Sequence, residues 1–405
     1  MDVESLVSKY SEVQLNILKN HLWSRYSSIS QKKKFNVIID LLHQCDINCL
    51  GCGTNAVCIS AQKVNVKQMK IEDIQKVVLQ INDYAHQHDL VPFINFGGGE
   101  PFLRGDILNI LKLASDIIGK ENVGIDTNGT LEDSYELLKE ALNYVGYIGI
   151  SINGLHDYHN WWANNKSFDA YQRAIDTLSR LNKIKGASEI IEVTTVATKR
   201  NYRSIPLLMK ELSDIGVKNY SVHRAMPVGR MKYWADELIM NPEEYFDTLV
   251  LLSNQAKELG MNAHMHHSIE AIYANALLNI NTYYMKNTLQ TSARSSISID
   301  PSGELLIDPW CTVGIWRKLS LGNIMDRGFS FDTSFDENGQ LLQEIHEAYS
   351  LGKRCKGCKM GCSGGSRLVA AATALNKKEN NLIDRKVIID ALCEVDPACY
   401  MAERI

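Results

Sequence analysis

The sequence predicts an α/β protein built on a partial (β/α)6 barrel of the TIM type, followed by a small cysteine-rich α+β domain. Two observations carry this prediction. From Phe35 onward, short β-branched runs alternate with longer amphipathic segments, which is typical of parallel βαβ units. Near residue 290 this pattern ends, and a hairpin followed by clustered cysteines takes its place. The 405 residues are enough for two or three domains of about 150 residues each.

Six segments have the length and composition of buried strands, and each precedes a stretch with helical periodicity, such as 71–84 or 171–184. In parallel βα units the loops that carry chemistry gather at the carboxyl ends of the strands, so functional residues are expected there. The predicted strands are Phe35–Asp40, Pro92–Phe96, Val123–Thr127, Tyr147–Ile152, Ile190–Ala197 and Asn219–His223.

Three domains are expected along the chain. Residues 1–34 have apolar side chains at helical spacing and predict a short helical extension. Residues 35–290 form the barrel, and residues 291–405 form the second domain. The second domain opens with two alternating apolar runs on either side of Pro301-Ser302-Gly303, which predicts a β-hairpin.

Composition narrows the function classes. A net charge of −4 gives no electrostatic reason to expect nucleic acid or an anionic membrane surface, so small molecules or peptides are the expected partners. No apolar run approaches the roughly 18 to 20 residues that span a bilayer, and the N-terminus lacks the order of a secretory signal. We therefore expect a cytoplasmic protein, in which ten cysteines indicate metal ligands or redox groups rather than disulfides.

The first cysteine group is Cys45-x3-Cys49-x2-Cys52, directly after the first predicted strand. Clustered soft thiolates select zinc or iron-sulfur clusters. With three protein ligands, a four-iron cluster keeps one iron open for another molecule. A closed zinc site completed by His43 is the alternative. At the end of the second predicted strand stands Gly97-Gly98-Gly99-Glu100-Pro101, where small residues permit close approach of the backbone.

Together these two segments resemble the radical S-adenosylmethionine (SAM) family, in which three cysteines hold a 4Fe-4S cluster whose open iron chelates SAM. The resemblance implies that Gly98 and Gly99 line the methionine end of SAM and that Glu100 orients its amino group. It places further SAM contacts at the later strand ends, on Asn128, Ser151, Asn153 and, toward the adenine, Met226.

The sequence departs from the family pattern at two positions. Gly51 stands before the third cysteine, where the family usually has an aromatic residue beside the adenine. Asn160 lies in the region where an arginine often follows and holds the SAM carboxylate, so Arg224 is a candidate substitute, with a surface salt bridge as its alternative.

The second cysteine group, Cys355, Cys358, Cys362 and Cys399, resembles the SPASM domain of one branch of this family. The resemblance implies one auxiliary 4Fe-4S cluster, with Cys393 as a rival to Cys399 for the fourth ligand and zinc as the alternative metal. Cys311 is left without its usual co-ligands, because Arg327 and Ser366 stand at two positions where cysteines are expected.

The implied reaction is reductive cleavage of SAM to a 5'-deoxyadenosyl radical, which removes a hydrogen atom from a small-molecule or peptide substrate. An auxiliary cluster that accepts the remaining electron gives net oxidation, as in natural-product or peptide maturation. A thiol that quenches the substrate radical gives epimerisation. The resemblance also implies an electron donor such as flavodoxin or ferredoxin. Candidate bases are Asp157, His223 and Glu270, and candidate thiol donors are Cys58 and Cys311.

Two other classes remain open. A non-catalytic iron-sulfur or zinc scaffold is compatible with Gly51 and Asn160, although Gly98 to Glu100 argue against it. Polar methyl transfer from SAM is the other class, and it has no need of a low-potential cluster.

Overall fold

The computed structural model describes residues 3–26, 34–59, 68–265, 267–278, 296–351, 367–376, 383–394, 396–397 and 399. Within them the core is one curved ten-stranded sheet with the strand order β12-β11-β10-β1-β4-β5-β6-β7-β8-β9. A separate two-stranded ribbon pairs β2 with β3. The strands are β1 (Lys34–Leu42), β2 (Gln44–Cys45), β3 (Val57–Cys58), β4 (Val91–Gly98), β5 (Val123–Thr127), β6 (Tyr147–Ser151), β7 (Ile191–Ala197), β8 (Asn219–Arg224), β9 (Asn262–Met265), β10 (Ser296–Ile299), β11 (Glu304–Leu306) and β12 (Ser320–Asn323).

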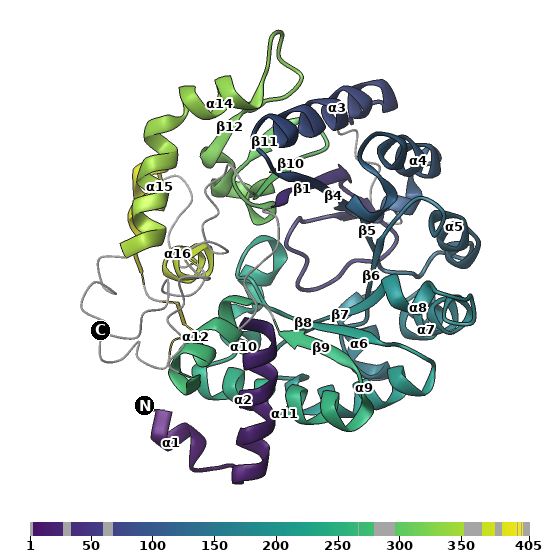
Figure 1. The fold of residues 1–405 in the computed structure, drawn as a ribbon, viewed down its shortest axis with the longest axis vertical. Helices are drawn as coiled ribbons and strands as arrows, with labels where there is room; N and C mark the ends of the chain where they lie inside the picture. The colour runs from purple at the N-terminus through teal and green to yellow at the C-terminus, as the bar shows by residue number, and fades with distance from the viewer. Residues whose placement is uncertain are drawn as a thin grey trace.

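Helices cover the outer side of the sheet, as Figure 1 shows along its right and lower edges. Six of them follow the parallel strands in turn: α3 (Ile71–Gln87), α4 (Ile107–Ile118), α5 (Ser134–Ala141), α7 (Ala170–Leu181), α9 (Ile205–Asp214) and α11 (Pro242–Leu259). Their connections are α6 (His156–Ala163), α8 (Ala187–Ile190), α10 (Ala235–Leu238) and the 3-10 turns η1 (Pro101–Leu103), η2 (Lys120–Asn122), η3 (Tyr202–Ser204) and η4 (Gly229–Trp234). The alternation of strand and helix confirms the predicted partial barrel.

All six predicted strands are present and parallel to their neighbours, from β1 through β4 to β8. Three details differ from the prediction. Ile190 ends helix α8 and lies outside strand β7, and Ile152 lies beyond the end of β6 at Ser151. A seventh parallel strand, β9, pairs with β8 and is not among the predicted strands.

The two faces of the sheet differ in chemistry. Residues in register on adjacent parallel strands share a face, so the outer face carries Ile39, Phe96, Ile125, Val193 and Val222, all fully buried in the main core. The inner face is polar. It carries Asp40, Asn95, Asp126, Tyr147, Ser151, Glu192, Thr194, Ser221, His223, His264 and Ser298. Closed barrels fill this interior with branched apolar side chains, and here the strands present hydrogen-bonding groups instead.

The C-terminal part has the predicted α+β composition. Strands β10 and β11 form the expected antiparallel hairpin, and β12 pairs with β11. The hairpin joins the main sheet, because β10 runs parallel to β1. The division at residue 290 into two domains stays a prediction. The remaining elements are η5 (Pro309–Thr312), η6 (Gly314–Leu319), α14 (Phe331–Glu337), α15 (Gly339–Leu351), α16 (Arg367–Leu375) and α17 (Arg385–Ala391). No helix of the described residues is both long and apolar enough to cross a bilayer.

The N-terminal segment is helical, with α1 (Val3–Val7) and α2 (Glu12–Tyr26), and α2 packs against α11 and α12 (His267–Leu278). The buried carboxylate of Glu270 holds α2 in place. Glu270 on α12 accepts hydrogen bonds from Arg25 Nε at 2.7 Å and from the Met265 backbone N–H at 2.7 Å, with His21 Nε2 at 3.5 Å. Burial acts to raise the pKa of Glu270, but His21 and the Arg25 charge outweigh it and lower the pKa to about 2.

We expect Glu270→Gln to lower the free energy of unfolding by about 2 kcal/mol, because hydrogen bonds to a buried charge are lost. The carboxylate has a pKa lowered from 4.5 to about 2 on folding, so its contribution is complete above pH 4.5 and is lost as the pH falls toward 2. Urea unfolding at pH 7 and at pH 3 measures both effects.

The matched control is Glu258→Gln on α11, where the side chain is exposed and a change within about 0.5 kcal/mol is expected. Unchanged stability of the Glu270→Gln protein would contradict this structural role and return Glu270 to the candidate bases.

Candidate functional site

The three cysteines of the first group lie where the sequence predicts, on the loop that leaves the carboxyl end of β1. Cys45 ends β2, which pairs with β3 so that Cys45 stands opposite Cys58. Cys49 and Cys52 follow in the turn between the two short strands. We name residues 43–59 the cysteine loop.

Arg230 of η4 holds the cysteine loop from the β8 side of the sheet. Its Nε donates to the Cys49 carbonyl at 2.8 Å, its Nη1 to the Ala56 carbonyl at 2.6 Å, and its backbone N–H to the Cys52 carbonyl at 2.9 Å. Three hydrogen bonds from one residue fix the turn that carries two of the three thiols. Arg230 is not among the predicted site residues, and no motif in the sequence marks it.

Helix α6 covers the same turn at Gly51. The backbone N–H of Leu50 donates to the Trp162 carbonyl at 2.9 Å. A Cβ atom on Gly51 would lie 2.2 Å from Cη2 of Trp162 and 2.7 Å from the Met231 methyl group. The indole of Trp162 therefore occupies the space in which a side chain at position 51 would stand, and this contact is the physical reason for glycine there.

The glycines after β4 contact the backbone of the cysteine loop directly. Gly99 N–H donates to the Leu42 carbonyl and Glu100 N–H to the Gln44 carbonyl, both at 2.8 Å. A Cβ atom on Gly99 would lie 1.8 Å from the Gln44 oxygen, and one on Gly98 would lie 2.5 Å from the Leu42 oxygen. These glycines let the end of β4 continue its pairing onto the loop. The predicted SAM contact of both remains a proposal.

Glu100 is fully buried and joins the end of β4 to the end of β5. Its carboxylate accepts hydrogen bonds from the Phe102 N–H at 3.1 Å, the Thr127 hydroxyl at 2.8 Å and the Asn128 N–H at 2.8 Å. Burial raises its pKa to about 8, although these three donors act in the opposite direction. The carboxylate thus has a structural role in addition to the predicted contact with the amino group of SAM.

Asn128, which is bonded to Glu100, also contacts the first cysteine and its neighbour Asp46. Its side-chain amide donates to Asp46 Oδ1 at 2.7 Å and lies 3.6 Å from the Cys45 sulfur. Asp46 also accepts a hydrogen bond from the Thr130 hydroxyl. Asp46 is not among the predicted site residues, and its position directly after Cys45 is the one signal in the sequence that points to it.

Burial favours the protonated form of two of the three thiols, Cys45 and Cys49, in the ligand-free chain. Burial raises the pKa of Cys49 to about 12 and raises that of Cys45 well above its usual value, and neighbouring thiols add to both shifts. Metal binding must therefore displace protons. Backbone and amide donors already point at two sulfurs, since Ala56 N–H lies 3.3 Å from the Cys52 sulfur and Asn128 lies near Cys45. Such donors stabilise thiolates, so this donor set suits an iron-sulfur cluster.

Among the residues that the structure describes, no group of three or more His, Cys, Asp or Glu side chains converges tightly enough to hold a single metal ion. The assignment of the three thiols to a cluster stays a prediction from their spacing.

The other predicted SAM contacts, at the ends of the later strands, lie in different environments. Ser151 lies on the inner face with its hydroxyl 3.4 Å from that of Thr194, and Met226 is buried after β8. Asn153 is used within the fold, because its side-chain oxygen accepts from the Val196 N–H at 2.9 Å and its backbone N–H donates to His159.

Arg224 requires a correction. Its guanidinium is fully buried and makes two parallel hydrogen bonds to Asp396, at 2.8 and 2.9 Å. Both terminal nitrogens of Arg224 are therefore already bonded to Asp396, whereas the prediction had them bind the SAM carboxylate. The alternative prediction, a salt bridge on the surface, is also wrong, because this pair is buried. It ties the end of β8 to the segment that carries Cys399, whose backbone N–H donates to the Asp396 carbonyl at 2.9 Å.

The predicted bases and thiol donors are scattered. Asp157 has a fully exposed side chain beside His156, and Glu270 belongs to the α2 contact described above. His223 lies on the inner face of β8. Cys58 is buried opposite Cys45 with its sulfur 3.4 Å from the Asp46 carbonyl, and Cys311 is buried in η5.

Cys355, Cys358 and Cys362 lie outside the described residues. Of the two rivals for the fourth ligand, Cys399 is buried and Cys393 is half-buried near the end of α17.

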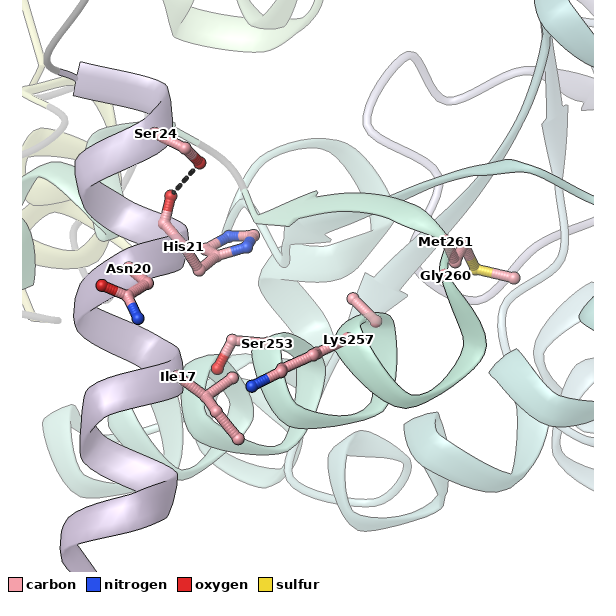
Figure 2. A pocket seen from close by; sticks show the side chains of 9 residues that line it. Ile17, Asn20, His21, Ser24, Ser253, Lys257, Gly260 and Met261 are labelled. Atoms are coloured by element: carbon pink, nitrogen blue, oxygen red, sulfur yellow. Dashed lines mark hydrogen bonds between the residues drawn. The ribbon is translucent and has the colours of Figure 1, made fainter.

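A pocket of about 390 Å³ lies between α2 and the end of α11, far from the cysteine loop along the strands. Figure 2 shows its walls, with His21 and Ser24 on one side and Lys257 on the other. Gly260 and Met261 in its lining directly precede β9, so the pocket opens at the amino ends of the strands. It is therefore separate from the candidate active site.

Comparisons with known proteins agree with this geometry. Residues 39–222 match the model of the radical SAM superfamily. The chain is 24% identical over 404 residues to Fe-coproporphyrin III synthase of Methanosarcina barkeri, covering 94% of this chain and 91% of that protein. It is 25% identical over 348 residues to the mycofactocin maturase MftC of Mycolicibacterium smegmatis, covering 83% and 79%. The crystal structure of Streptococcus suis SuiB bound to S-adenosylmethionine shares the fold, with a TM-score of 0.62 at 15% identity over 93% of this chain and 79% of that one.

Residues 39–222, which carry the three-cysteine loop and the segment Gly98 to Pro101, match the radical SAM superfamily, as the spacing of the cysteines predicts. The predicted cofactors, a 4Fe-4S cluster with an open iron and S-adenosylmethionine, are those of this family.

Gly99→Ala should disturb the cysteine loop, because the added methyl group collides with the Gln44 carbonyl. We expect a loss of about 2 kcal/mol or more in unfolding free energy. Iron per chain after anaerobic reconstitution should fall with it.

Gly97→Ala is the matched control, since the nearest atom to its new Cβ is Asp40 Oδ1 at 3.9 Å, an ordinary contact. Full iron loading of the Gly99→Ala protein would show that the close approach is dispensable.

Proposed function

We propose that this protein reductively cleaves SAM and removes a hydrogen atom from a peptide substrate, with net oxidation of that substrate. The observation that carries the proposal is the placement of Cys45, Cys49 and Cys52 on one braced loop at the carboxyl end of β1, beside the glycines after β4. This is the position expected for an active site in a parallel α/β barrel.

The chain's own residues would bind and orient the cofactors. Cys45, Cys49 and Cys52 would each hold one iron. Gly98 and Gly99, which let the end of β4 pair with the cysteine loop, would line the methionine end of SAM. Asn128 would donate a hydrogen bond to the Cys45 sulfur. When bound, the cluster and SAM supply a 5'-deoxyadenosyl radical that takes hydrogen from an unactivated C–H bond.

Two observations favour a peptide over a porphyrin. A relative named as a maturase matches 83% of this chain, and SuiB, which shares the fold, has also been solved bound to its precursor peptide SuiA. The inner face of the sheet offers carboxylates, amides and hydroxyls, which suit the hydrogen-bonding groups of a peptide better than a flat apolar ring. A small polar molecule is the second candidate substrate.

Net oxidation depends on a second redox centre. Cys399, one candidate ligand of an auxiliary cluster, is buried, and its neighbour Asp396 is bound to Arg224 at the end of β8. Cys355, Cys358 and Cys362 would supply the other thiolates. A cluster held there would accept the electron left on the substrate, and a reductase such as flavodoxin or ferredoxin would supply the first electron.

Epimerisation is the alternative reaction, and Cys58 is the observation that favours it. This thiol is buried and stands opposite Cys45 in the β2–β3 pair, one strand away from the first cluster ligand. Such a thiol would give a hydrogen atom to the opposite face of the substrate radical and so invert the stereocentre. The thiyl radical left on Cys58 would take up one electron from the reductase and one proton, so the substrate would undergo no net oxidation.

The first test is anaerobic reconstitution with iron and sulfide, followed by dithionite and SAM and chromatographic detection of 5'-deoxyadenosine. We expect product from the wild type, none from the Cys45→Ala, Cys49→Ala and Cys52→Ala proteins, and product from Cys58→Ala as the matched control. Stoichiometric zinc, or no 5'-deoxyadenosine from fully loaded wild type, would leave the scaffold interpretation.

Iron content tests the second cluster and its ligands. Two four-iron clusters correspond to about eight irons per chain, and replacement of all three cysteines of the first group should leave about four. We expect Cys399→Ala to lose the auxiliary iron and Cys393→Ala to keep it. The opposite result would assign the fourth ligand to Cys393, and four irons in the wild type would remove the auxiliary cluster altogether.

A further inference from the structure

Segment η4 joins the cysteine loop to an exposed aromatic surface. At its start, the backbone N–H of Arg230 donates to the Cys52 carbonyl at 2.9 Å. Three residues later, the side chain of Tyr233 is 76% exposed. A 3-10 helix rises about 2 Å per residue, so the backbone of Tyr233 lies within about 10 Å of that carbonyl. The cysteine loop is therefore close to solvent on this side.

Aromatic rings fill the space between the cysteine loop and this surface. Trp162, which covers the turn of the loop, stacks on Tyr158 with ring centroids 6.2 Å apart and an interplanar angle of 25°. Tyr158 contacts Trp161 at 5.3 Å, and Trp161 contacts Trp234 of η4 at 5.9 Å. Cys49 packs against the same cluster. A set of rings in contact thus leads from a predicted cluster ligand to half-buried side chains at the surface.

Two cationic side chains lie over these rings. Arg200 is 4.7 Å from the ring centroid of Trp161, and Lys232 is 4.9 Å from that of Tyr233. Aromatic residues and arginine are enriched where proteins bind one another, because rigid rings bury much area at a low cost in conformational entropy. We call this surface, formed by α6, η4 and the turn after β7, the aromatic-basic patch. It consists of Trp161, Arg200, Lys232, Tyr233 and Trp234.

The patch is basic in a chain whose net charge is −4. Two of its segments, residues 199–200 and 229–237, carry four basic and two acidic side chains. Among the nearby carboxylates, Glu237 pairs with Arg200 at 2.7 Å, and Asp157 on α6 pairs with His156 at 2.8 Å. A protein with an acidic binding face would be steered to this patch and away from the remaining, more acidic surface.

We propose that the aromatic-basic patch docks a small acidic flavin protein, flavodoxin, which delivers an electron to the cluster held by the cysteine loop. The reduced flavin loses one electron and the cluster gains it. The inference rests on the proposed function and names the partner and its docking surface for the same site.

The size and chemistry of the patch fit this partner. Electron-transfer complexes are short-lived and often bury less than about 1,200 Å², so a patch of a few side chains is enough. The exposed ring of Tyr233 suits the apolar edge of a flavin, because aromatic systems pack well in offset or edge-to-face contact. A partner bound there would bring its flavin close to Cys49 and Cys52, and electron transfer is faster over shorter distances.

The first test measures binding without turnover. The reconstituted full chain is titrated calorimetrically with oxidised flavodoxin at low salt. We expect the Lys232→Glu/Tyr233→Ala protein to bind about tenfold or more weakly than the wild type, and Tyr233→Phe to bind as the wild type does. The matched control is Lys76→Glu/Leu79→Ala, which makes similar changes at two exposed positions of α3, beside β4 and far along the sheet from β8. It should bind like the wild type.

The second test compares two reductants in SAM cleavage. With reduced flavodoxin, Lys232→Glu/Tyr233→Ala should form 5'-deoxyadenosine about tenfold more slowly than the wild type. With dithionite, which needs no docking surface, the two rates should be equal.

Four results would overturn the proposal: no binding of flavodoxin by the wild type, equal binding by the double variant, an equal loss of rate with both reductants, or SAM cleavage driven by a ferredoxin but not by flavodoxin. Absent 5'-deoxyadenosine from fully loaded wild type with dithionite would count against the proposed function, whereas the binding titration would still test the patch.

Discussion

The buried carboxylate of Glu100 is the interaction on which the candidate site depends. It gathers donors from the turn after β4 and from the end of β5, and Asn128 carries the connection to Asp46 beside the first cysteine. A continuous set of hydrogen bonds thus runs from two strand ends to the cysteine loop. Breaking any member would leave a buried polar group unpaired, which costs more than the hydrogen bond itself is worth, so the loop behaves as part of the sheet edge.

The opposite side of the cysteine loop is held by hydrogen bonds from an arginine and by the packing of a tryptophan. Arg230 donates to loop carbonyls, and Trp162 fills the space above Gly51. Residues without regular secondary structure are in this way fixed from both the β4–β5 side and the β8 side. A cluster ligand must hold its position while the cofactor and the substrate bind, and two independent supports meet that demand.

The sequence predicts the parts of this molecule that depend on local pattern. Strands β1 and β4 to β8 follow from buried apolar runs, and the cysteines and glycines follow from spacing. Strand β9 is only four residues of mixed polarity, Asn262–Met265, and carries no such pattern. Asp46 and Arg230 owe their roles to partners brought near by the fold. Arg224 and Asp396 are 172 positions apart, so only the packed structure reveals that they pair.

The segment after β8 contacts both cysteine-bearing regions of the described chain. Arg224 at the end of the strand forms two hydrogen bonds to Asp396, close to Cys399 in the sequence. Arg230, six residues later, donates hydrogen bonds to the carbonyls of Cys49 and Ala56. The short segment 224–230 therefore contacts both the cysteine loop and the region of Cys399. On the proposed function this matters directly, because electron transfer between two centres falls steeply with distance. Because the Arg224 pair is fully buried, loss of either partner would leave an unpaired charge in the interior, so the pair is expected to persist as long as the chain is folded.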